Sequence, residues 1–269
     1  MESIFIVFAS AVAVERLIHI VPLGWEADRA VLPIKSMRGH GVYLLANPDS
    51  HPLQRHFLQL VRRRLEEIPV EVTTVRVDAA ADLKGLVNAI GRIIQKEVKA
   101  GNRVYINASA AGKIAAVAAT LAGMAHLAGN GLVYYARPED YILSEEEQMR
   151  HGLTRGLDGD PMDIPLFRIS LPSPSGCLVL CALAVKGKAK SATYQDLFNL
   201  LHSAHFSGFP QITKDTKRSI KGRATVNLTK TILRPLREAG YISIEREGKR
   251  AIVTLTKEGE LMADLIARE

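Results

Sequence analysis

The chain is 269 residues long, 47% apolar and 23% charged, so it is long enough for two domains and apolar enough to form their cores. Its net charge of +7 falls entirely in the last third, because residues 175–269 hold 16 Lys and Arg against 9 Asp and Glu, whereas residues 1–174 hold 19 of each. The apolar content argues against a disordered chain, and the charge distribution predicts a polyanion as partner. DNA fits better than a membrane, because no long apolar stretch adjoins the charge.

An apolar stretch, Ile4–Val14, opens the chain. It resembles the apolar part of a signal peptide, but Glu2 stands where basic residues precede such a part, and eleven residues are too few to span a bilayer. We expect a strand, or an extension before the first strand, rather than a secretion signal.

Apolar runs alternate with amphipathic stretches as far as residue 135. Strands are predicted at 17–23, 42–46, 70–77, 104–106 and 132–135, and helices at 26–37, 54–68, 82–100 and 112–128. This alternation predicts βαβ units, and therefore a Rossmann-like, doubly wound, mostly parallel α/β sheet over residues 1–143. The near-continuous apolar character of the strands indicates that helices cover both faces of the sheet.

Two loops of this sheet are candidate ligand sites. The loop 107–113 joins a strand to a helix N-terminus, where backbone N–H groups favour an anion, and 22–29 follows the first strand at the same edge. Small residues in the loop also suit tight packing, and Trp25 could stack on a base or cap the core. The predicted ligand-binding residues are Leu23, Gly24, Trp25, Asn107, Ala108, Ser109, Ala110, Gly112 and Lys113.

Residues 144–174 are rich in Glu and then in Gly and Pro, which is typical of a connection between domains. Pro165–Leu171 could add one more strand. The last domain, 175–269, begins with predicted helices at 177–185 and 193–202 and closes with a helix for which Thr256 is the N-cap. Cys177 and Cys181 lie in the first of these helices. With no further metal ligand at a recognisable spacing, they indicate buried reduced thiols and a cytoplasmic protein.

The stretch Lys217–Thr256 predicts a winged helix-turn-helix, with a helix from about residue 225 to 239. Its apolar face is expected to hold Val226, Thr229, Leu233 and Leu236, and its cationic face Arg223, Asn227, Lys230, Arg234 and Arg237. Pro235 should kink it, and Gly240 should end it. Two short strands around Gly248 then form a basic wing.

The cationic face and the wing are the predicted DNA-binding surface. The N-terminal half of the helix should meet base edges in the major groove, and the wing should contact phosphates or the minor groove. The predicted DNA-binding residues are Arg223, Thr225, Asn227, Lys230, Arg234, Arg246, Lys249 and Arg250. A solvated charge is the alternative for each basic residue taken singly, but it explains the one-sided set poorly.

Two sets of motifs resemble known families. AGYI at 239–242 and IVTLTKEGE at 252–260 resemble MarR-like winged-helix regulators, and HIVPLG at 19–24 and INASAAGK at 106–113 resemble the CARF domain, the Rossmann-like sensor of CRISPR-associated regulators. Together they resemble archaeal CARF-type winged-helix transcription regulators. This resemblance implies a homodimer that binds a cyclic oligoadenylate or related nucleotide across its axis and a palindromic DNA site. Ala110 and Ala111 stand where that family usually has glycines and a Thr.

We therefore expect a ligand-responsive, sequence-specific DNA-binding transcription regulator. No metal site, cofactor or catalytic constellation is predicted, because neither the histidine spacing nor any Ser-His-Asp order or GxSxG pattern supports one. The alternative is a CARF-like ring nuclease that degrades cyclic oligoadenylate, with Ser109 and Lys113 orienting the scissile phosphate. A nucleotide-binding enzyme with a basic appendage is a third interpretation.

Overall fold

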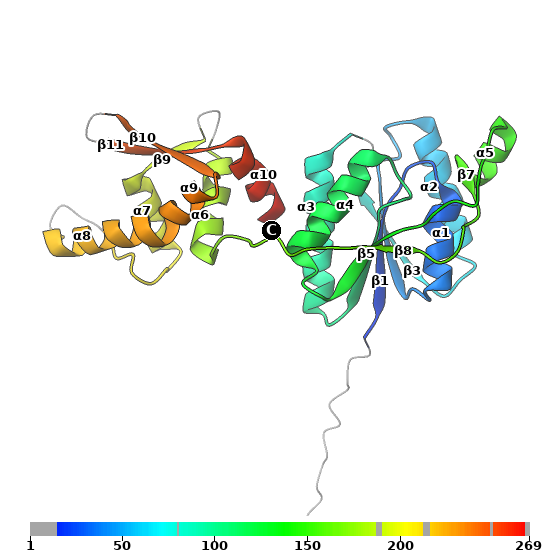
Figure 1. Cartoon of the computed structure of the whole chain (residues 1–269), viewed down its shortest axis with the longest axis horizontal. Coiled ribbons are helices and arrows are strands. Elements are labelled where there is room, and N and C mark those ends of the chain that lie inside the picture. Colours follow the sequence, from blue (N-terminus) through cyan, green and yellow to red (C-terminus); the bar gives the residue numbers. More distant parts are fainter. Residues whose placement is uncertain (1–14, 80, 187–189, 212–215, 248–249, 267–269) are drawn as a thin grey trace, which may run out of the picture.

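The computed structural model describes residues 15–79, 81–186, 190–211, 216–247 and 250–266. The predicted strand or extension at Ile4–Val14 lies outside these residues, as does Lys249. Figure 1 shows two bodies joined by a long strap, with the N-terminal sheet in one and the winged helix in the other. Within the described residues, no helix has the length and hydropathy needed to cross a bilayer.

The N-terminal body is the predicted mostly parallel, Rossmann-like sheet. Its strands run in the order β3-β2-β1-β4-β5-β8, parallel except for the antiparallel edge strand β8. The strands are β1 (Leu17–Pro22), β2 (Gly41–Ala46), β3 (Glu71–Arg76), β4 (Arg103–Asn107), β5 (Gly131–Tyr135) and β8 (Met162–Ile164). The order turns at β1 and β4, and their carboxyl ends form the crevice in which open α/β sheets bind ligands.

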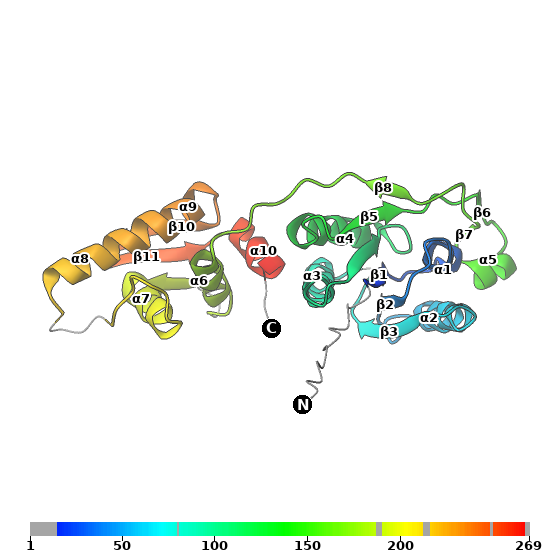
Figure 2. The same ribbon diagram turned by 90° about the horizontal axis from the view of Figure 1, so that it is seen from below.

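Helices cover both faces of this sheet, as predicted from the apolar strands. The helices are α1 (Ala27–Ser36), α2 (Pro52–Leu65), α3 (Leu83–Lys99) and α4 (Lys113–His126). Figure 2 shows α1 and α2 on one face and α3 and α4 on the other. The buried residues of α4 are all Ala or Gly, and a Cβ on Gly123 would lie 2.6 Å from a methyl group of Val133. Small residues therefore let α4 approach the sheet closely.

The connection predicted at 144–174 is more structured than expected. It contains α5 (Glu145–His151) and β7 (Thr154–Arg155), and β7 pairs with β6 (Asp140–Tyr141). The extra strand is β8, three residues long, and not Pro165–Leu171, which forms no strand. The strand expected at 165–171 was wrong. The true strand β8 is held by backbone pairing with the end of β5, and its Met162 is half exposed, so no run of buried apolar residues marks it in the sequence.

The C-terminal body is a winged helix. Its helices are α6 (Pro174–Ala184), α7 (Tyr194–Ser203), α8 (Arg218–Asn227), α9 (Arg234–Glu238) and α10 (Lys257–Ile266), and its sheet has the order β10-β11-β9. The wing strands are β10 (Ile242–Glu247) and β11 (Arg250–Leu255), and β9 (Ser191–Thr193) was not predicted. Thr256 caps α10 as expected, since its hydroxyl accepts the N–H of Gly259 at 3.0 Å.

The helix that precedes the wing differs from the prediction in length and in its buried face. It begins at Arg218 and runs through α8, a π-helical segment at Leu228–Leu233 and α9. Val226, expected on the apolar face, is 51% exposed. The buried residues are Ala224, Leu228, Ile232, Leu233 and Leu236. The π-helical segment ends just before Pro235, which lies in the first turn of α9 and has no N–H to donate to the preceding turn. The irregularity predicted at Pro235 is therefore present as a π-helical segment rather than as a sharp kink.

His19 is a buried histidine at the centre of β1. Its Nδ1 lies 3.1 Å from the hydroxyl oxygen of Tyr134, and its Nε2 has no hydrogen-bond partner among the described residues. Burial lowers the pKa of His19 to about 4. The folded state therefore holds the ring neutral at pH values where the unfolded chain binds a proton.

This burial predicts a pH-dependent free energy of unfolding. Because the folded pKa lies below the unfolded value, the contribution is complete above pH 6.5 and is lost as pH falls toward the folded pKa. Between pH 7.5 and pH 5 the loss due to His19 should be about 2 kcal/mol. Urea unfolding at both pH values should give a smaller difference for His19→Gln than for the wild type. Equal differences would contradict the assignment.

Candidate ligand pocket and nucleic-acid interface

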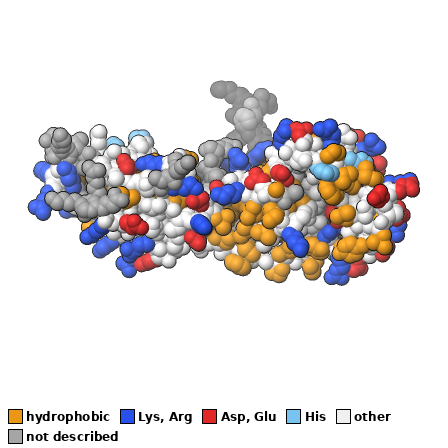
Figure 3. Space-filling view, turned by 90° about the horizontal axis from the view of Figure 1, so that it is seen from above, with side chains coloured by type: hydrophobic (Ala, Val, Ile, Leu, Met, Phe, Trp, Pro, Cys, Tyr) orange, Lys and Arg blue, Asp and Glu red, His pale blue; other side chains and the backbone are white. Residues whose placement is uncertain are grey.

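A cavity of about 310 Å³ opens at the carboxyl ends of β1 and β4. Its lining comes from the loops after β1, β2 and β4, from the first turn of α2, and from single residues before α3 and between α5 and β7. The lining residues are Gly24, Trp25, Glu26, Ser50, His51, Gln54, Ala79, Ala111, Gly112 and Leu153. Hydrophobic side chains gather on this side of the N-terminal body in the view of Figure 3. The predicted meeting of the first and fourth strand ends in one pocket is therefore present.

The two loops meet through their backbones. The N–H of Gly24 donates to the carbonyl of Ala110 at 2.8 Å. A Cβ added at Gly24 would lie 3.0 Å from Cα of Ala111, so any side chain here would press on the opposite loop. Gly24 is therefore required for the close approach of the loops rather than for turn conformation.

Asn107 organises the loop after β4 from within. Its Oδ1 accepts the N–H of Ser109 at 2.8 Å, the Ser109 hydroxyl at 2.6 Å and the N–H of Ala110 at 3.1 Å. Its Nδ2 donates to the carbonyl of Arg29 at 2.8 Å. The Ser109 oxygen also accepts the N–H of Ala136 at 3.0 Å. Both side chains are buried and hold the loop in shape, with their polar atoms directed at the protein.

The predicted ligand-binding residues thus divide into three groups. Gly24, Trp25 and Gly112 line the cavity. The buried residues behind it are Leu23, Asn107, Ala108, Ser109 and Ala110. Lys113 is exposed at the first position of α4 and does not line the cavity.

His51 is a lining residue that the sequence did not single out. It caps α2, with Nδ1 accepting the N–H of Leu53 at 3.2 Å, so in the neutral ring the proton resides on Nε2. The indole of Trp25, which is 37% exposed, packs against this ring with centroids 5.4 Å apart. The pair gives the cavity an aromatic wall with two N–H groups, one on Nε2 of His51 and one on the indole nitrogen of Trp25. The available signal was the position of His51 at the end of the loop after β2, which is the neighbour of β1 in the sheet.

Gln54 and Glu26 complete the polar part of the lining. Gln54 is buried and donates from Nε2 to the carbonyl of Leu23 at 2.8 Å. The carboxylate of Glu26 accepts the Thr154 hydroxyl at 2.6 Å and lies 3.6 Å from the Arg29 guanidinium. Burial raises the pKa of Glu26, and the contacts with Thr154 and Arg29 partly oppose that shift. The polar atoms of Gln54 and Glu26 therefore bond to other protein groups in the cavity wall. The remaining lining consists mainly of backbone, aromatic and small apolar groups.

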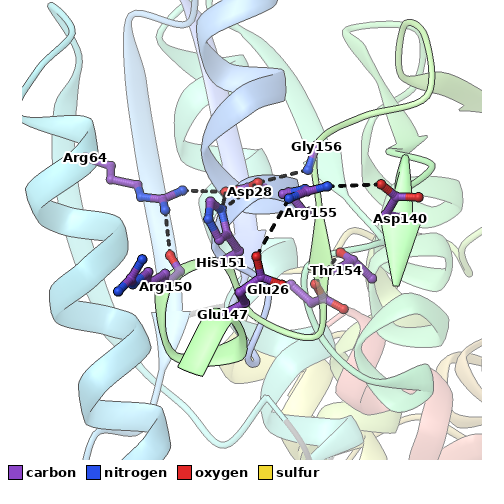
Figure 4. A network of polar contacts seen from close by, with 10 residues as sticks. All are labelled: Glu26, Asp28, Arg64, Asp140, Glu147, Arg150, His151, Thr154, Arg155 and Gly156. Atoms are coloured by element: carbon purple, nitrogen blue, oxygen red, sulfur yellow. Dashed lines mark hydrogen bonds and ion pairs between the residues drawn. The ribbon is translucent and has the colours of Figure 1, made fainter. Parts of the chain in front are cut away.

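The segment 140–156, which contains β6, α5 and β7, is fixed to this edge by a buried carboxylate (Figure 4). Asp28 accepts from the Arg64 guanidinium, from the N–H of Gly156 at 2.9 Å and from Nδ1 of His151 at 3.2 Å. The N–H of Leu153 donates to the carbonyl of Trp25 at 3.1 Å. These contacts place Leu153 in the cavity wall.

The second site is the outer face of α8 and the following helix. Figure 1 shows α8 extending from the winged helix away from the N-terminal body. Of its ten residues only Ala224 is buried. The predicted contact residues Arg223, Thr225, Lys230, Arg234 and Arg246 are exposed. Arg237, which was expected on the cationic face, is exposed as well, and so are Lys217 and Arg218, which were not in the predicted set.

Two predicted DNA-contacting residues have internal partners. Asn227 is half-buried, and its Oδ1 accepts the Thr231 hydroxyl at 3.0 Å. Arg234 pairs with Glu238 at 2.8 Å one turn away on the same exposed face. That contact is exposed and therefore weak enough to give way to a phosphate. Arg250 lies at the first position of β11.

Both bodies match known domain families. Residues 17–141 match the family model described as "HFX_2341_N:-like, N-terminal", and residues 176–267 match "DUF6293 C-terminal winged helix domain". The organisation expected from the sequence, a Rossmann-like domain followed by a winged helix, is confirmed. A comparison with curated proteins found no match.

Three solved structures illustrate the structural similarities. The protein VC1899 from Vibrio cholerae is 14% identical with a TM-score of 0.37, over 92% of this chain and 64% of its own. Can2 from Sulfobacillus thermosulfidooxidans, in complex with cyclic tetra-adenylate, is 17% identical with a TM-score of 0.38, over 84% and 58%. Csm6 from Enterococcus italicus, bound to cyclic hexa-2′-fluoro-hexa-dAMP, is 8% identical with a TM-score of 0.39, over 80% and 54%. The chain therefore spans less than two thirds of each of these proteins.

Proposed function

We propose that this chain, which joins an HFX_2341_N-like N-terminal domain to a DUF6293 C-terminal winged helix domain, is a ligand-responsive transcription regulator that binds specific DNA sequences. The observation that carries the proposal is the exposed cationic face of the protruding α8 and of the helix that continues it. An α-helix with such a face fits the major groove, and the exposed Arg246 on β10 extends the cationic surface to the wing.

The pocket supports a nucleotide as the ligand. Trp25 and His51 offer an aromatic wall for a base, and the start of α4 offers backbone N–H groups for a phosphate. Gly112 caps that helix without a side chain, so a phosphate can approach the backbone closely. A cyclic oligoadenylate, the ligand implied by the sequence resemblance, is the first candidate.

The exposed face of α4 supports a homodimer. From Ile114 to Ala125 the helix carries no charged residue, and Ile114 and Val117 are 39% and 48% exposed. A helix that is apolar on nearly all sides is normally covered on all sides. Two copies joined through this face would bring two winged helices to one palindromic DNA site and two pockets close to one axis.

Binding rather than cleavage is the activity that we propose for the pocket. The alternative, a ring nuclease, needs Ser109 at the scissile phosphate, but its hydroxyl donates to Asn107 and accepts from Ala136. Lys113 does not line the cavity. Incubation of cyclic tetra-adenylate with the protein and chromatography of the products would reveal a linear product if the alternative holds.

One set of measurements tests the regulator. The purified protein should select a palindromic sequence from random duplexes, bind it with an affinity that falls steeply with salt, and form a complex with two chains per duplex by light scattering. Since Trp25 is the only tryptophan, nucleotide binding should change the intrinsic fluorescence, and saturation should change the DNA affinity about 5- to 150-fold. Absence of DNA binding at low salt would refute the proposal.

A further inference from the structure

The helix α10 belongs to the winged helix but also packs on the N-terminal body. One side of it lies on α6, and another lies on α3 and α4 (Figure 1). Met262, Ala263, Leu265 and Ile266 are buried in a core that continues without a break into α3 and α4. The helix α10 therefore joins the core of the winged helix to α3 and α4.

Polar contacts fix α10 to the N-terminal body at two points. The ammonium of Lys84 on α3 lies 2.9 Å from Asp264 and 3.9 Å from Glu260. Nε2 of His126, in the last turn of α4, lies 2.6 Å from the carbonyl oxygen of Leu265. We call Lys84, His126, Glu260, Asp264 and Leu265 the α10 latch.

The geometry of His126 fixes the direction of its hydrogen bond. Nδ1 lies 3.3 Å from the amide nitrogen of Gln95, which donates, so the ring proton resides on Nε2 and is donated to Leu265. Burial lowers the pKa of His126 and so favours this neutral ring. The contact joins the last turn of α4 to the last turn of α10.

The helix α4 connects the pocket with the latch. Its N-cap Gly112 lines the cavity, and His126 is its last residue, about 20 Å away along the helix axis. Glu260 also pairs with Lys190, next to β9 of the winged helix, at 2.5 Å. A continuous path therefore runs from the pocket through α4 and α10 to the wing sheet.

The packed face of α4 permits a sliding movement. It consists of Ala115, Ala118, Ala119, Ala122, Gly123 and Ala125. Because these side chains are small, the helix has shallow ridges, and a shift along its axis breaks few interlocked contacts. The long side chains at the latch convert such a shift into made or broken contacts.

We propose that the α10 latch is the element through which ligand in the pocket controls the DNA-binding helix. Ligand at the α4 N-terminus displaces α4, the displacement alters the contacts of His126 and Lys84 with α10, and α10 reorients the winged helix. The inference rests on the proposed function and adds its means of regulation.

The test compares four proteins. DNA affinity is measured with and without saturating cyclic tetra-adenylate for the wild type, Lys84→Glu, the charge-swapped pair Lys84→Glu with Asp264→Lys, and Arg92→Glu. Arg92 is exposed on the same helix, and the structure shows no ion pair for it among the described residues. Trp25 fluorescence reports in parallel whether each protein still binds the nucleotide.

We expect the Lys84→Glu variant to bind both DNA and cyclic tetra-adenylate. The nucleotide should change the DNA affinity of this variant less than twofold. The charge-swapped pair should recover at least half of the wild-type effect, and Arg92→Glu should retain all of it. An unchanged effect in Lys84→Glu, or no recovery in the pair, would overturn the latch and leave the regulator standing. If the nucleotide left the DNA affinity of the wild type unchanged, the proposed regulation would be refuted, and the role of the α10 latch with it.

Discussion

Replacing Arg223 by Ala should weaken binding to the selected DNA site by about 1–3 kcal/mol, or roughly 5- to 150-fold, and should relax the base preference at one position of each half-site. Arg223 is exposed near the middle of α8, the helix that extends farthest from the winged helix. An Arg at this place can reach a guanine edge with two hydrogen bonds. The free energy of unfolding should not change, because the side chain buries nothing.

Two further substitutions separate base reading from charge. Arg246→Ala in β10 should weaken binding to all DNA sequences by the same factor. It should also reduce the slope of log affinity against log salt by about 0.9, the value for one phosphate contact. Arg63→Ala removes the same charge from α2 in the N-terminal body and should leave DNA binding unchanged. If Arg223→Ala weakened random and selected duplexes equally, Arg223 would be a phosphate contact and not a base reader.

The sheet could be predicted because its central strands β1, β2 and β4 are largely buried on both faces. Residues 17–22 and 103–107 are apolar runs that contain one or two polar residues, and the helices between strands have clear apolar faces. The boundaries of the wing could be predicted as well. Gly240, expected to end the preceding helix, has a positive φ of 78°, and Thr256, expected to cap the next helix, does so. In these elements the local signal and the tertiary packing favour the same structure.

The segment 140–156 could not be predicted for the opposite reason. Its strands β6 and β7 have two residues each, and Tyr141 is 75% exposed, so no apolar period marks them. The segment is held by contacts of Glu26 and Asp28, which are more than 100 residues away in sequence. Hydrogen bonds between a carboxylate and groups so distant in sequence leave no local pattern from which the segment could be predicted.

The ligand loop shows a different limit. Asn107 and Ser109 were predicted to bind a ligand because their loop joins the carboxyl end of a strand to a helix N-terminus. Asn107 instead accepts three hydrogen bonds from the following residues, the last of them Ala110. An Asn at the start of a tight turn is also the usual residue for this bonding, so the sequence was compatible with both roles. Only the position of the side chain distinguishes them.

Replacing Asp28 by Ala should lower the free energy of unfolding of the N-terminal body by about 3 kcal/mol, because a buried carboxylate leaves behind donors that lose their acceptor. The carboxylate is 7% exposed and accepts from Arg64, His151 and the N–H of Gly156. Arg64 keeps some access to water, with 26% of its side chain exposed, which limits the loss. Asp28→Asn should cost less, since an amide oxygen still accepts.

The same substitution should release the segment 140–156 from the pocket. Trypsin should then cut the folded protein after Arg150 or Arg155, both of which lie in this segment, and nucleotide binding should weaken because Leu153 leaves the cavity wall. The matched control is Asp140→Ala, which breaks the exposed pair with Arg155, whose side chains are 59% and 50% exposed. Such a pair contributes about 0–1 kcal/mol. The Asp140→Ala variant should therefore have nearly the same free energy of unfolding as the wild type and the same resistance to trypsin. Equal effects of the two substitutions would show that Asp28 does not anchor the segment, and that other contacts, among them the Thr154–Glu26 and Leu153–Trp25 hydrogen bonds, hold the pocket wall.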